Sequence, residues 1–263
     1  MKFLFLILVF STGLIANDAQ SIFKKFEAKS YSLKMKGVKD LVFDLESELL
    51  TRQINEQQVF GKIDQLFFRV YWTLTPERVA VEVIGLPGGF KEMKEELKAS
   101  ISPFIDEIIS KPLESKFTGY KFFVKPQTNE VIATDSTGLA HIPSHHLKFD
   151  QEDRLVQIVS NKPVGSMVLD FQYEKNRSTD GKWFKNQEIL SINENGQEIK
   201  SSKIFNYISL NGITFIQEVK LTTEKKSGNK TVEQIKISDK IKFSHFKVNE
   251  GLAMKYFLSM LPR

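Results

Sequence analysis

The chain of 263 residues contains no cysteine. This absence excludes disulfide bonds, thiol nucleophiles and the cysteine-based zinc and iron–sulfur sites. It also excludes the lipid-modified N-terminal cysteine of a bacterial lipoprotein. The fold must therefore be stabilised by burial of apolar side chains. These are plentiful, because 41% of the residues are hydrophobic and 26% are charged, a balance typical of a packed globule and not of a disordered chain.

Long runs of one charge are also missing. The formal net charge is +5, but Lys and Arg are spread along the whole sequence and never form a run of five or more. Polybasic tails that bind nucleic acid or anionic membranes need such runs. We therefore interpret the positive charge as that of a solvated surface and expect no nucleic-acid partner.

Histidine is scarce, with four in the chain, and three of them lie in the segment 141–146, HIPSHH. A metal site is one interpretation of this spacing, but Pro143 forbids the helix that would bring His141 and His145 to one face. We favour a solvated loop or strand edge and expect no metal site. His245 occupies a strand position and is interpreted as a partly buried packing residue.

Nucleophile and cofactor motifs are missing as well. A Gly-x-Ser-x-Gly elbow does not occur, since Gly165-Ser166 lacks the second glycine. The glycine-rich segment 86–89 matches neither the phosphate-loop nor the dinucleotide fingerprint. We expect a protein that is not an enzyme and uses no cofactor. A secreted hydrolase that combines one of the clustered histidines with a carboxylate and a nucleophile is a less favoured hypothesis.

The one long apolar run lies at the N-terminus. Lys2 is followed by an uninterrupted apolar stretch over 3–10 and then by the small residue Ala16, the pattern of a cleaved secretory signal. As a helix, residues 3–15 would span only about 20 Å, against a hydrocarbon core of about 30 Å. This length disfavours a membrane anchor. We expect residues 1–16 to be a signal peptide and the mature product, 17–263, to be a soluble periplasmic protein.

Residues 17–263 are predicted to form a single domain of the α+β class. Helical spacing of apolar residues predicts an amphipathic helix over 18–33, a helical insertion over about 90–111 and a C-terminal helix over about 250–261. Within the insertion, Ser102-Pro103 has the pattern of an N-cap followed by a first helical residue. This predicts two helices that meet at an angle.

The remainder is predicted to be antiparallel strands. Apolar and polar residues alternate from Leu41 to Leu49, and again over 66–83 around the Thr75-Pro76 turn, which indicates a hairpin. From about Tyr120 onward, short alternating runs separated by Asn-Gly and Asp-Gly turns predict a meander up to about Val248. About ten strands are too many for a flat open sheet. We expect a strongly curved half-barrel with the helices covering its concave face.

Phenylalanine dominates the aromatic residues, with 22 Phe against 6 Tyr and 2 Trp. One interpretation is a Phe-rich core. The other is that some of these side chains line an apolar cavity for acyl chains beneath the helices. Candidates on the early strands and the inserted helix are Phe68, Trp72, Phe104, Ile105 and Ile108. The sequence does not show whether these side chains line a cavity or fill the core.

A short pattern carries a family resemblance. The segment 68–78, FRVYWTLTPER, is an aromatic strand followed by Pro, Arg and a second strand, and it resembles the LolA/LolB/LppX-like superfamily. Segments 207–213 and 246–249 are similar to that family's later sheet, and the order of elements also agrees. The resemblance implies a curved half-barrel closed by helices around an apolar cavity. It further implies a periplasmic carrier of lipoprotein acyl chains or other lipids between membranes.

The resemblance also implies residue roles and partners. In LolA-type carriers an arginine on an early strand hydrogen-bonds the lid in the closed state, and Arg69 or Arg78 would take that role here. Transport components of the inner and outer membranes would be partners of a monomeric carrier. The helical insertion is long and the C-terminal helix has no match in the family, so lipid-like cargo follows more directly than lipoprotein cargo. The alternative is a non-catalytic interaction or assembly module of the cell envelope.

Overall fold

The computed structural model describes residues 12–57, 63–194, 196–227 and 235–260. Most of the predicted signal peptide, residues 1–11, lies outside the described residues. The helices within the described ranges include none that is long and apolar enough to cross a membrane.

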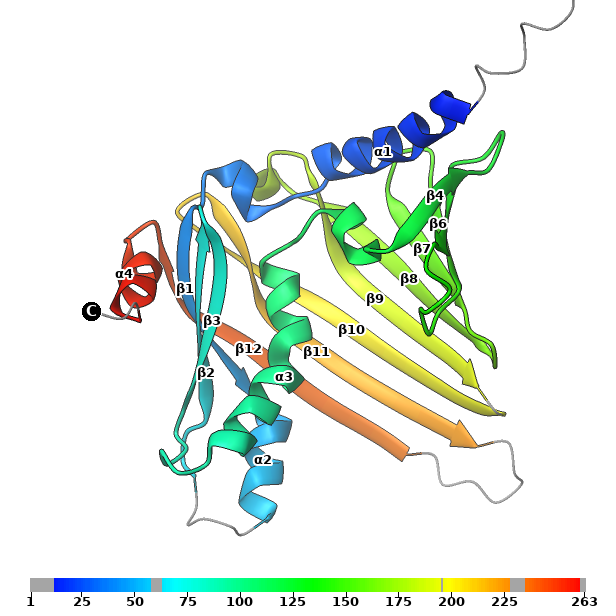
Figure 1. The fold of residues 1–263 in the computed structure, drawn as a ribbon. Coiled ribbons are helices and arrows are strands. Elements are labelled where there is room, and N and C mark those ends of the chain that lie inside the picture. Colours follow the sequence, from blue (N-terminus) through cyan, green and yellow to red (C-terminus); the bar gives the residue numbers. More distant parts are fainter. Residues whose placement is uncertain (1–11, 58–62, 195, 228–234, 261–263) are drawn as a thin grey trace, which may run out of the picture.

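One antiparallel sheet of twelve strands forms the body of the protein (Figure 1). The strands are β1 (Asp40–Ser47), β2 (Phe67–Leu74), β3 (Glu77–Ile84), β4 (Tyr120–Val124), β5 (Glu130–Asp135), β6 (Ser144–Phe149), β7 (Leu155–Asn161), β8 (Ser166–Lys175), β9 (Trp183–Glu194), β10 (Gln197–Leu210), β11 (Ile213–Ser227) and β12 (Ile235–Val248). Their order is β3-β2-β1-β12-β11-β10-β9-β8-β7-β6-β5-β4. The sheet is open, because β3 and β4 form its two edges.

The topology follows from local turns and one long-range pairing. Most paired strands are consecutive in sequence, and some are joined by tight turns, as at Asn211-Gly212, where both residues have positive φ (51° and 76°), the backbone that such hairpin turns require. The exception is β1, which pairs with β12 and so joins the first hairpin to the end of the meander. The predicted α+β fold with a curved antiparallel sheet is thus confirmed, and the β2–β3 hairpin lies where the sequence placed it.

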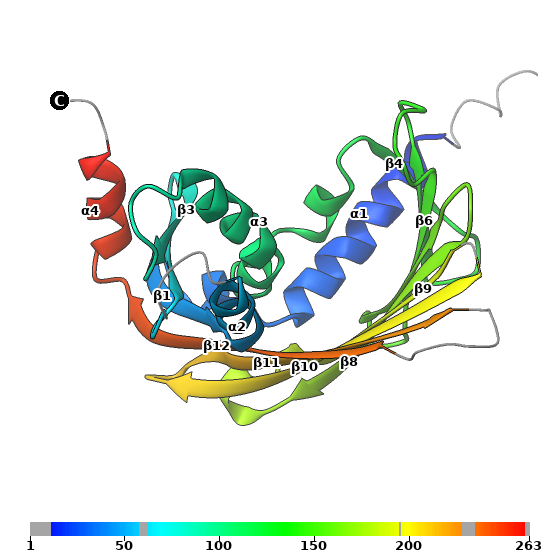
Figure 2. The same cartoon turned by 90° about the horizontal axis from the view of Figure 1, so that it is seen from below.

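Four α-helices accompany the sheet in the described ranges: α1 (Thr12–Lys29), α2 (Glu48–Glu56), α3 (Lys91–Ile108) and α4 (Leu252–Ser259). Figure 2 shows α1, α2 and α3 within the curve of the sheet and α4 outside it, next to β1. Short 3-10 helices lie at Leu33–Lys36, Leu113–Phe117 and Arg177–Thr179.

Two predictions about helices are wrong. The insertion is one continuous helix, α3, with Pro103 inside it. A proline removes only one backbone hydrogen bond of the helix, and the buried face runs on across it from Ile101 to Ile105. The alternation from Leu41 does not continue as a strand to Leu49 either, because the Ser47 hydroxyl accepts a hydrogen bond from the Leu50 amide at 3.1 Å and caps α2.

Two large hydrophobic clusters and a small third one, formed by Val42, Ala253 and Phe257 at α4, make up the core of the described residues. The larger cluster lies under α3, against β1, β2, β11 and β12, and includes the fully buried Phe43, Phe68 and Ile101. The second large cluster lies between α1 and strands β4–β7 and includes Phe23 and Leu147. The inner face of the long strands between these two clusters belongs mostly to neither, and this stretch is the candidate site.

Candidate functional site

The middle of the sheet carries an apolar inner face that the helices leave uncovered. Directly paired residues of antiparallel strands share one face of a sheet, so the register shows which side chains point inward. Lys203 of β10 points inward, since its Nζ lies 3.2 Å from a carboxylate oxygen of Glu107 on α3. Its partners Glu188 on β9 and Leu221 on β11 share that face.

Two further rows of inward side chains follow along the same strands. The first row crosses from β7 to β12 and comprises Ile158, Leu169, Leu190, Ser201, Thr223 and Ile237. The second comprises Ser160, Met167, Ile192, Ile199, Lys225 and Ile235. Apolar residues hold most of these positions, and we call the surface formed by both rows the inner trough.

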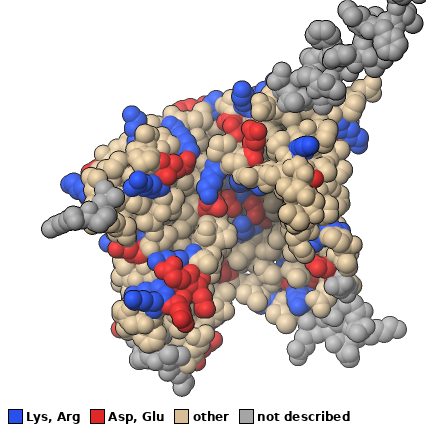
Figure 3. All heavy atoms as spheres, viewed as in Figure 1, with Lys and Arg blue, Asp and Glu red and all other residues tan. Residues whose placement is uncertain are grey.

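The inner trough is mostly apolar, yet it is exposed at its β12 edge and only half-buried along β8–β10, while Ser160 at its β7 edge is buried. Ile235 is 52% exposed and Ile237 is 46% exposed, and Leu190 and Ile199 are only half-buried. Residues on the opposite face of the same strands are largely polar, such as Ser191, which precedes Ile192 on β9. Figure 3 shows a hollow between the lobe that carries α3 and the lobe that carries β4–β7, with charged side chains at its upper end. A trough of this kind is an unsatisfied hydrophobic surface.

A compact cluster of four charges closes one end of the inner trough. The Glu107 carboxylate from α3 lies 2.7 Å from Lys185 Nζ and 3.2 Å from Lys203 Nζ. The Glu188 carboxylate from β9 lies 2.6 Å from the same Lys185 Nζ and 2.8 Å from Lys203 Nζ. Each carboxylate therefore bridges both ammonium groups. We call these residues the charge quartet.

Burial strengthens the charge quartet. The four side chains are between 10% and 21% exposed. Burial by itself would raise the pKa of Glu188, but the charges and hydrogen bonds of Lys185 and Lys203 outweigh it and lower that pKa from 4.5 to about 2. For Lys203, burial acts to lower the pKa, while the charges of Glu107 and Glu188 raise it above its usual value. Glu188 and Lys203 are thus both charged at neutral pH.

Aromatic residues surround the charge quartet. Lys185 Nζ lies 4.7 Å from the centre of the Phe205 ring, and Lys203 Nζ lies 5.9 Å from that of Phe104, distances at which a cation is attracted to a ring face. The Tyr207 hydroxyl donates to the Lys185 carbonyl at 2.6 Å. Burial, reinforced by the Glu107 charge, raises the pKa of this hydroxyl, so it stays neutral.

The apolar residues predicted to line a cavity occupy two different places. Phe68 and Trp72 are 0% and 1% exposed and belong to the larger core cluster together with Ile105 and Ile108, so here they fill space. Phe104 is only partly buried, and its ring faces Lys203 beside the inner trough. Among the predicted residues, Phe104 is therefore the one that the structure places next to the exposed surface.

The two candidate arginines lie on the opposite face of the sheet from α3. Arg69 alternates with the inward Phe68, and its guanidinium binds Asp44 through two hydrogen bonds of 2.8 and 2.9 Å. Arg78 of β3 pairs with Thr73 of β2, so these two residues lie on the same face of the sheet. Thr73 shares this face with Tyr71 and Arg69, because side chains alternate along a strand. Arg78 is exposed. The ion pairs between α3 and the sheet are made instead by Glu107 of the charge quartet.

The expectation that His245 is a packing residue is wrong. Its side chain is 73% exposed, with Nδ1 at 3.2 Å from an Asp44 carboxylate oxygen. The cause is an irregularity in the pairing of β1 with β12 between Val42 and Asp44, where His245 adopts a positive φ of 54°. A bulge of this kind turns a side chain out of the alternation.

Two of the clustered histidines have polar partners, and His146 Nδ1 lies 3.4 Å from a Glu130 carboxylate oxygen. His145 Nδ1 lies 2.7 Å from the Ser160 hydroxyl, but Ser160 is 1% exposed, and the His145 ring packs edge-on against Phe117 and Tyr120. Burial lowers the pKa of His145. A substrate does not reach a serine in this position, so this pair is interpreted as a packing contact of the second core cluster.

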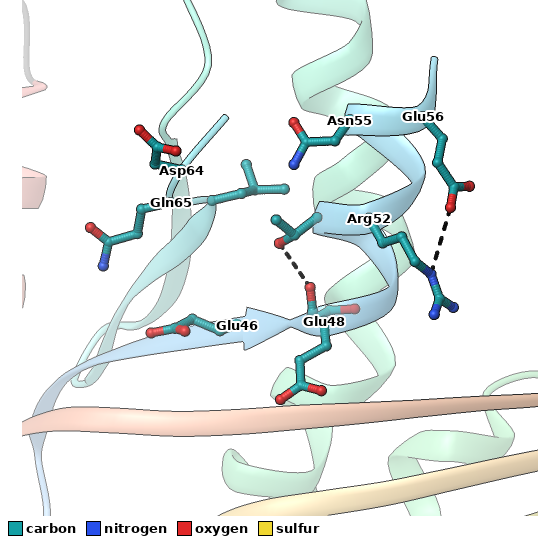
Figure 4. Close-up of a pocket in the computed structure, with 10 residues that line it drawn as sticks. Glu46, Glu48, Arg52, Asn55, Glu56, Asp64 and Gln65 are labelled. Carbon is teal, nitrogen blue, oxygen red and sulfur yellow. Dashed lines mark hydrogen bonds and ion pairs between the residues drawn. The ribbon is translucent and has the colours of Figure 1, made fainter. Parts of the chain in front are cut away.

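A separate pocket of about 570 Å³ lies beside α2 (Figure 4). It is lined by Glu46, Ser47, Glu48, Thr51, Arg52, Asn55, Glu56, Asp64, Gln65 and Leu66. Arg52 pairs with Glu56 at 3.9 Å. Within the described ranges, no group of three or more acidic or histidine side chains is placed to hold a metal ion. The pocket adjoins residues outside the described ranges and receives no assignment.

Comparison with known proteins leaves the geometry as the main evidence. Protein-family models, curated proteins and solved structures give no match to this chain. The resemblance to the LolA/LolB/LppX-like superfamily accordingly rests on the sequence pattern. Function is argued below from the inner trough and the charge quartet.

Sequence reasoning did not find the charge quartet. Glu107 lies 78 residues from Lys185 and 96 from Lys203, so no local spacing links them. One signal was present: Lys185 and Glu188 interrupt the apolar pattern of strand β9 on the face that later carries Leu190 and Ile192. Charged residues on an inward face indicate either a partner or a site.

Proposed function

We propose that the inner trough binds the hydrocarbon chain of a lipid and that the protein carries the chain through an aqueous compartment. The observation that supports this proposal is the exposed apolar inner face of strands β8–β12. Monomeric proteins rarely leave a large contiguous apolar surface in water unless it binds something. A chain laid along the trough would remove that surface from water without any catalytic group.

The size of the trough suits such a ligand. Two rows lie about 7 Å apart, and the charge quartet lies about 7 Å beyond them, since a strand rises about 3.4 Å per residue. Six strands at about 4.8 Å spacing make the floor about 24 Å wide. The resulting area of roughly 300 Å² corresponds to about 7 kcal/mol of gross stabilisation at about 25 cal/mol per Å², before the cost of association.

The helices flank the inner trough in this proposal. At its C-terminal end α1 is fixed to the sheet, because the Tyr31 amide donates to the Trp183 carbonyl at 2.7 Å and Lys29 pairs with Asp153 at 2.6 Å. Near the trough α3 is held by Glu107 of the charge quartet. Because Ile101 and Ile105 keep α3 buried in the larger core cluster, the Glu107 side chain near its end, and not the whole helix, would shift to admit or release a chain.

The cellular setting remains part of the proposal. A cleaved signal peptide over 1–16 would place a freely diffusing monomer in the periplasm, where lipids must cross water between two membranes. The resemblance to the LolA/LolB/LppX-like superfamily supports the same role, with lipoprotein acyl chains or other lipids as cargo. Inner- and outer-membrane transport components would then load and unload the carrier.

A substitution within the inner trough tests the proposal. Leu190→Glu places a charge on the apolar floor, where Leu190 is already half-buried and solvent-accessible. Binding of a fluorescent fatty acid should weaken at least tenfold. The matched control is Ile189→Glu, one residue along β9 on the outer face, which should leave the affinity unchanged. The wild type purified from cells should also yield lipid on solvent extraction and mass spectrometry.

Failure of these measurements would favour a second function. The outward side of α4 carries exposed apolar residues, with Leu258 at 59% and Met260 at 60% exposure, and this supports a non-catalytic interaction module. A wild type that yields no lipid and binds no fatty acid contradicts the carrier proposal. A photo-crosslinker at Leu258 that captures one envelope protein would support the module instead.

A further inference from the structure

The charge quartet combines three charges from the sheet with one from α3. Lys185, Glu188 and Lys203 belong to β9 and β10, whereas Glu107 is close to the end of α3 at Ile108. The quartet is neutral as a whole. If the Glu107 side chain turns out of the quartet, the three groups that remain on the strands carry a net charge of +1.

A mostly buried, unbalanced cation is strongly unfavourable, so the departure of the Glu107 carboxylate calls for a replacement anion. Glu188 cannot supply it, because its two oxygens already lie 2.6 Å from Lys185 Nζ and 2.8 Å from Lys203 Nζ. The vacated position lies between the same two ammonium groups, which Glu107 contacts at 2.7 and 3.2 Å. A group with two oxygens and one negative charge matches that position in charge and in shape.

The position also lies at the end of the apolar floor. Lys203 and Glu188 form the row next to Leu190 and Ser201, about 7 Å along the strands. A ligand whose tail covers the inner trough therefore has its end at the two lysines. The Phe104 ring from α3 lies beside Lys203 and would pack against the first part of the tail.

From this geometry we propose that the ligand is a single-chain carboxylate amphiphile, a free fatty acid, whose head replaces Glu107 between Lys185 and Lys203. The inference rests on the proposed function and specifies its substrate class. Exchange of one carboxylate for another keeps the buried charge balanced in both states. Displacement of the Glu107 carboxylate is thereby coupled to arrival of an anionic head and not to a neutral lipid.

The test compares an acid with a neutral analogue of the same shape. Binding of a pyrene-labelled fatty acid and of the matching fatty alcohol is titrated with the full chain. The wild type should prefer the acid at least tenfold. Glu107→Gln leaves the lysines with excess positive charge before the ligand arrives, so its preference for the acid over the alcohol should be at least tenfold greater than that of the wild type. Glu96→Gln, an exposed α3 residue, is the control and should match the wild type.

A second variant guards against a folding defect. Lys203→Gln should lose most of the preference for the acid while retaining affinity for the alcohol, with folding verified by circular dichroism. Equal affinity of the wild type for acid and alcohol, unchanged in Glu107→Gln, would overturn the carboxylate assignment and leave the apolar trough intact. Failure of both ligands to bind any variant would overturn the proposed function as well.

Discussion

The charge quartet predicts a specific dependence of stability on pH. Glu188 has a pKa near 4.5 in an unfolded chain and about 2 in the folded protein. Burial opposes this shift, and the two ammonium groups of Lys185 and Lys203 produce it. A carboxylate whose pKa is lower in the folded state stabilises the fold at pH values above its unfolded pKa, and this stabilisation is lost as the pH falls toward the folded pKa.

The size of the effect follows from the shift. A difference of about 2.5 pKa units corresponds to about 3 kcal/mol at pH 7, at about 1.4 kcal/mol per unit. At pH 3 the Glu188 carboxyl group is mostly protonated in the unfolded chain and mostly ionised in the folded protein. About 2 kcal/mol of the stabilisation is therefore lost between pH 7 and pH 3. We expect Glu188→Gln to cost about 3 kcal/mol at pH 7 and to remove this pH dependence.

Urea denaturation at pH 7 and pH 3 measures both quantities. Other carboxylates with lowered pKa, such as Asp150, are present in both proteins and cancel in the comparison. Between the two pH values the wild type should lose about 2 kcal/mol more free energy of unfolding than Glu188→Gln. The exposed Glu198 on β10 provides the control, and Glu198→Gln should follow the wild type. Equal losses in wild type and Glu188→Gln would refute the description of the quartet as a buried ion-pair cluster.

Two further predictions concern the fold that holds the site. Phe68 is fully buried in the larger core cluster, so Phe68→Ala should lower the free energy of unfolding by about 3–5 kcal/mol; a loss below about 1 kcal/mol in urea denaturation would contradict its role as core. Gly85 has φ +103°, and a Cβ there would lie 2.0 Å from the Gln65 carbonyl oxygen. Gly85→Ala should therefore lower the midpoint of thermal unfolding by several degrees. An unchanged midpoint would show that this turn is not constrained as described.

The sequence predicted the sheet better than it predicted the site. Alternation of apolar residues and turns such as Asn211-Gly212 are local signals, and they located the hairpins and the curved antiparallel sheet. The joining of β1 to β12 is a long-range pairing with no local signal. Helix α2 was missed because Ser47 ends the alternation through a cap that is visible only in three dimensions.

The residues around the proposed ligand illustrate the same limit. Phe104 was a candidate because of its helix position, and it lies beside the trough. Arg69 was a candidate through the family resemblance, yet strand alternation turns it to the outer face, where Asp44 binds it. Glu107 and Lys203 were not candidates, because the fold brings them together from segments 96 residues apart.

Paramagnetic broadening in methyl NMR spectra tests the central claim most directly. A stearate that carries a nitroxide label on its chain would be added to protein with isotopically labelled Ile, Leu and Met methyl groups. The account predicts stronger broadening of Met167, Leu190 and Ile192 in the inner trough than of Ile204 on the outer face of β10. Broadening of Ile204 without Leu190, or of no methyl group at all, would contradict binding in the trough.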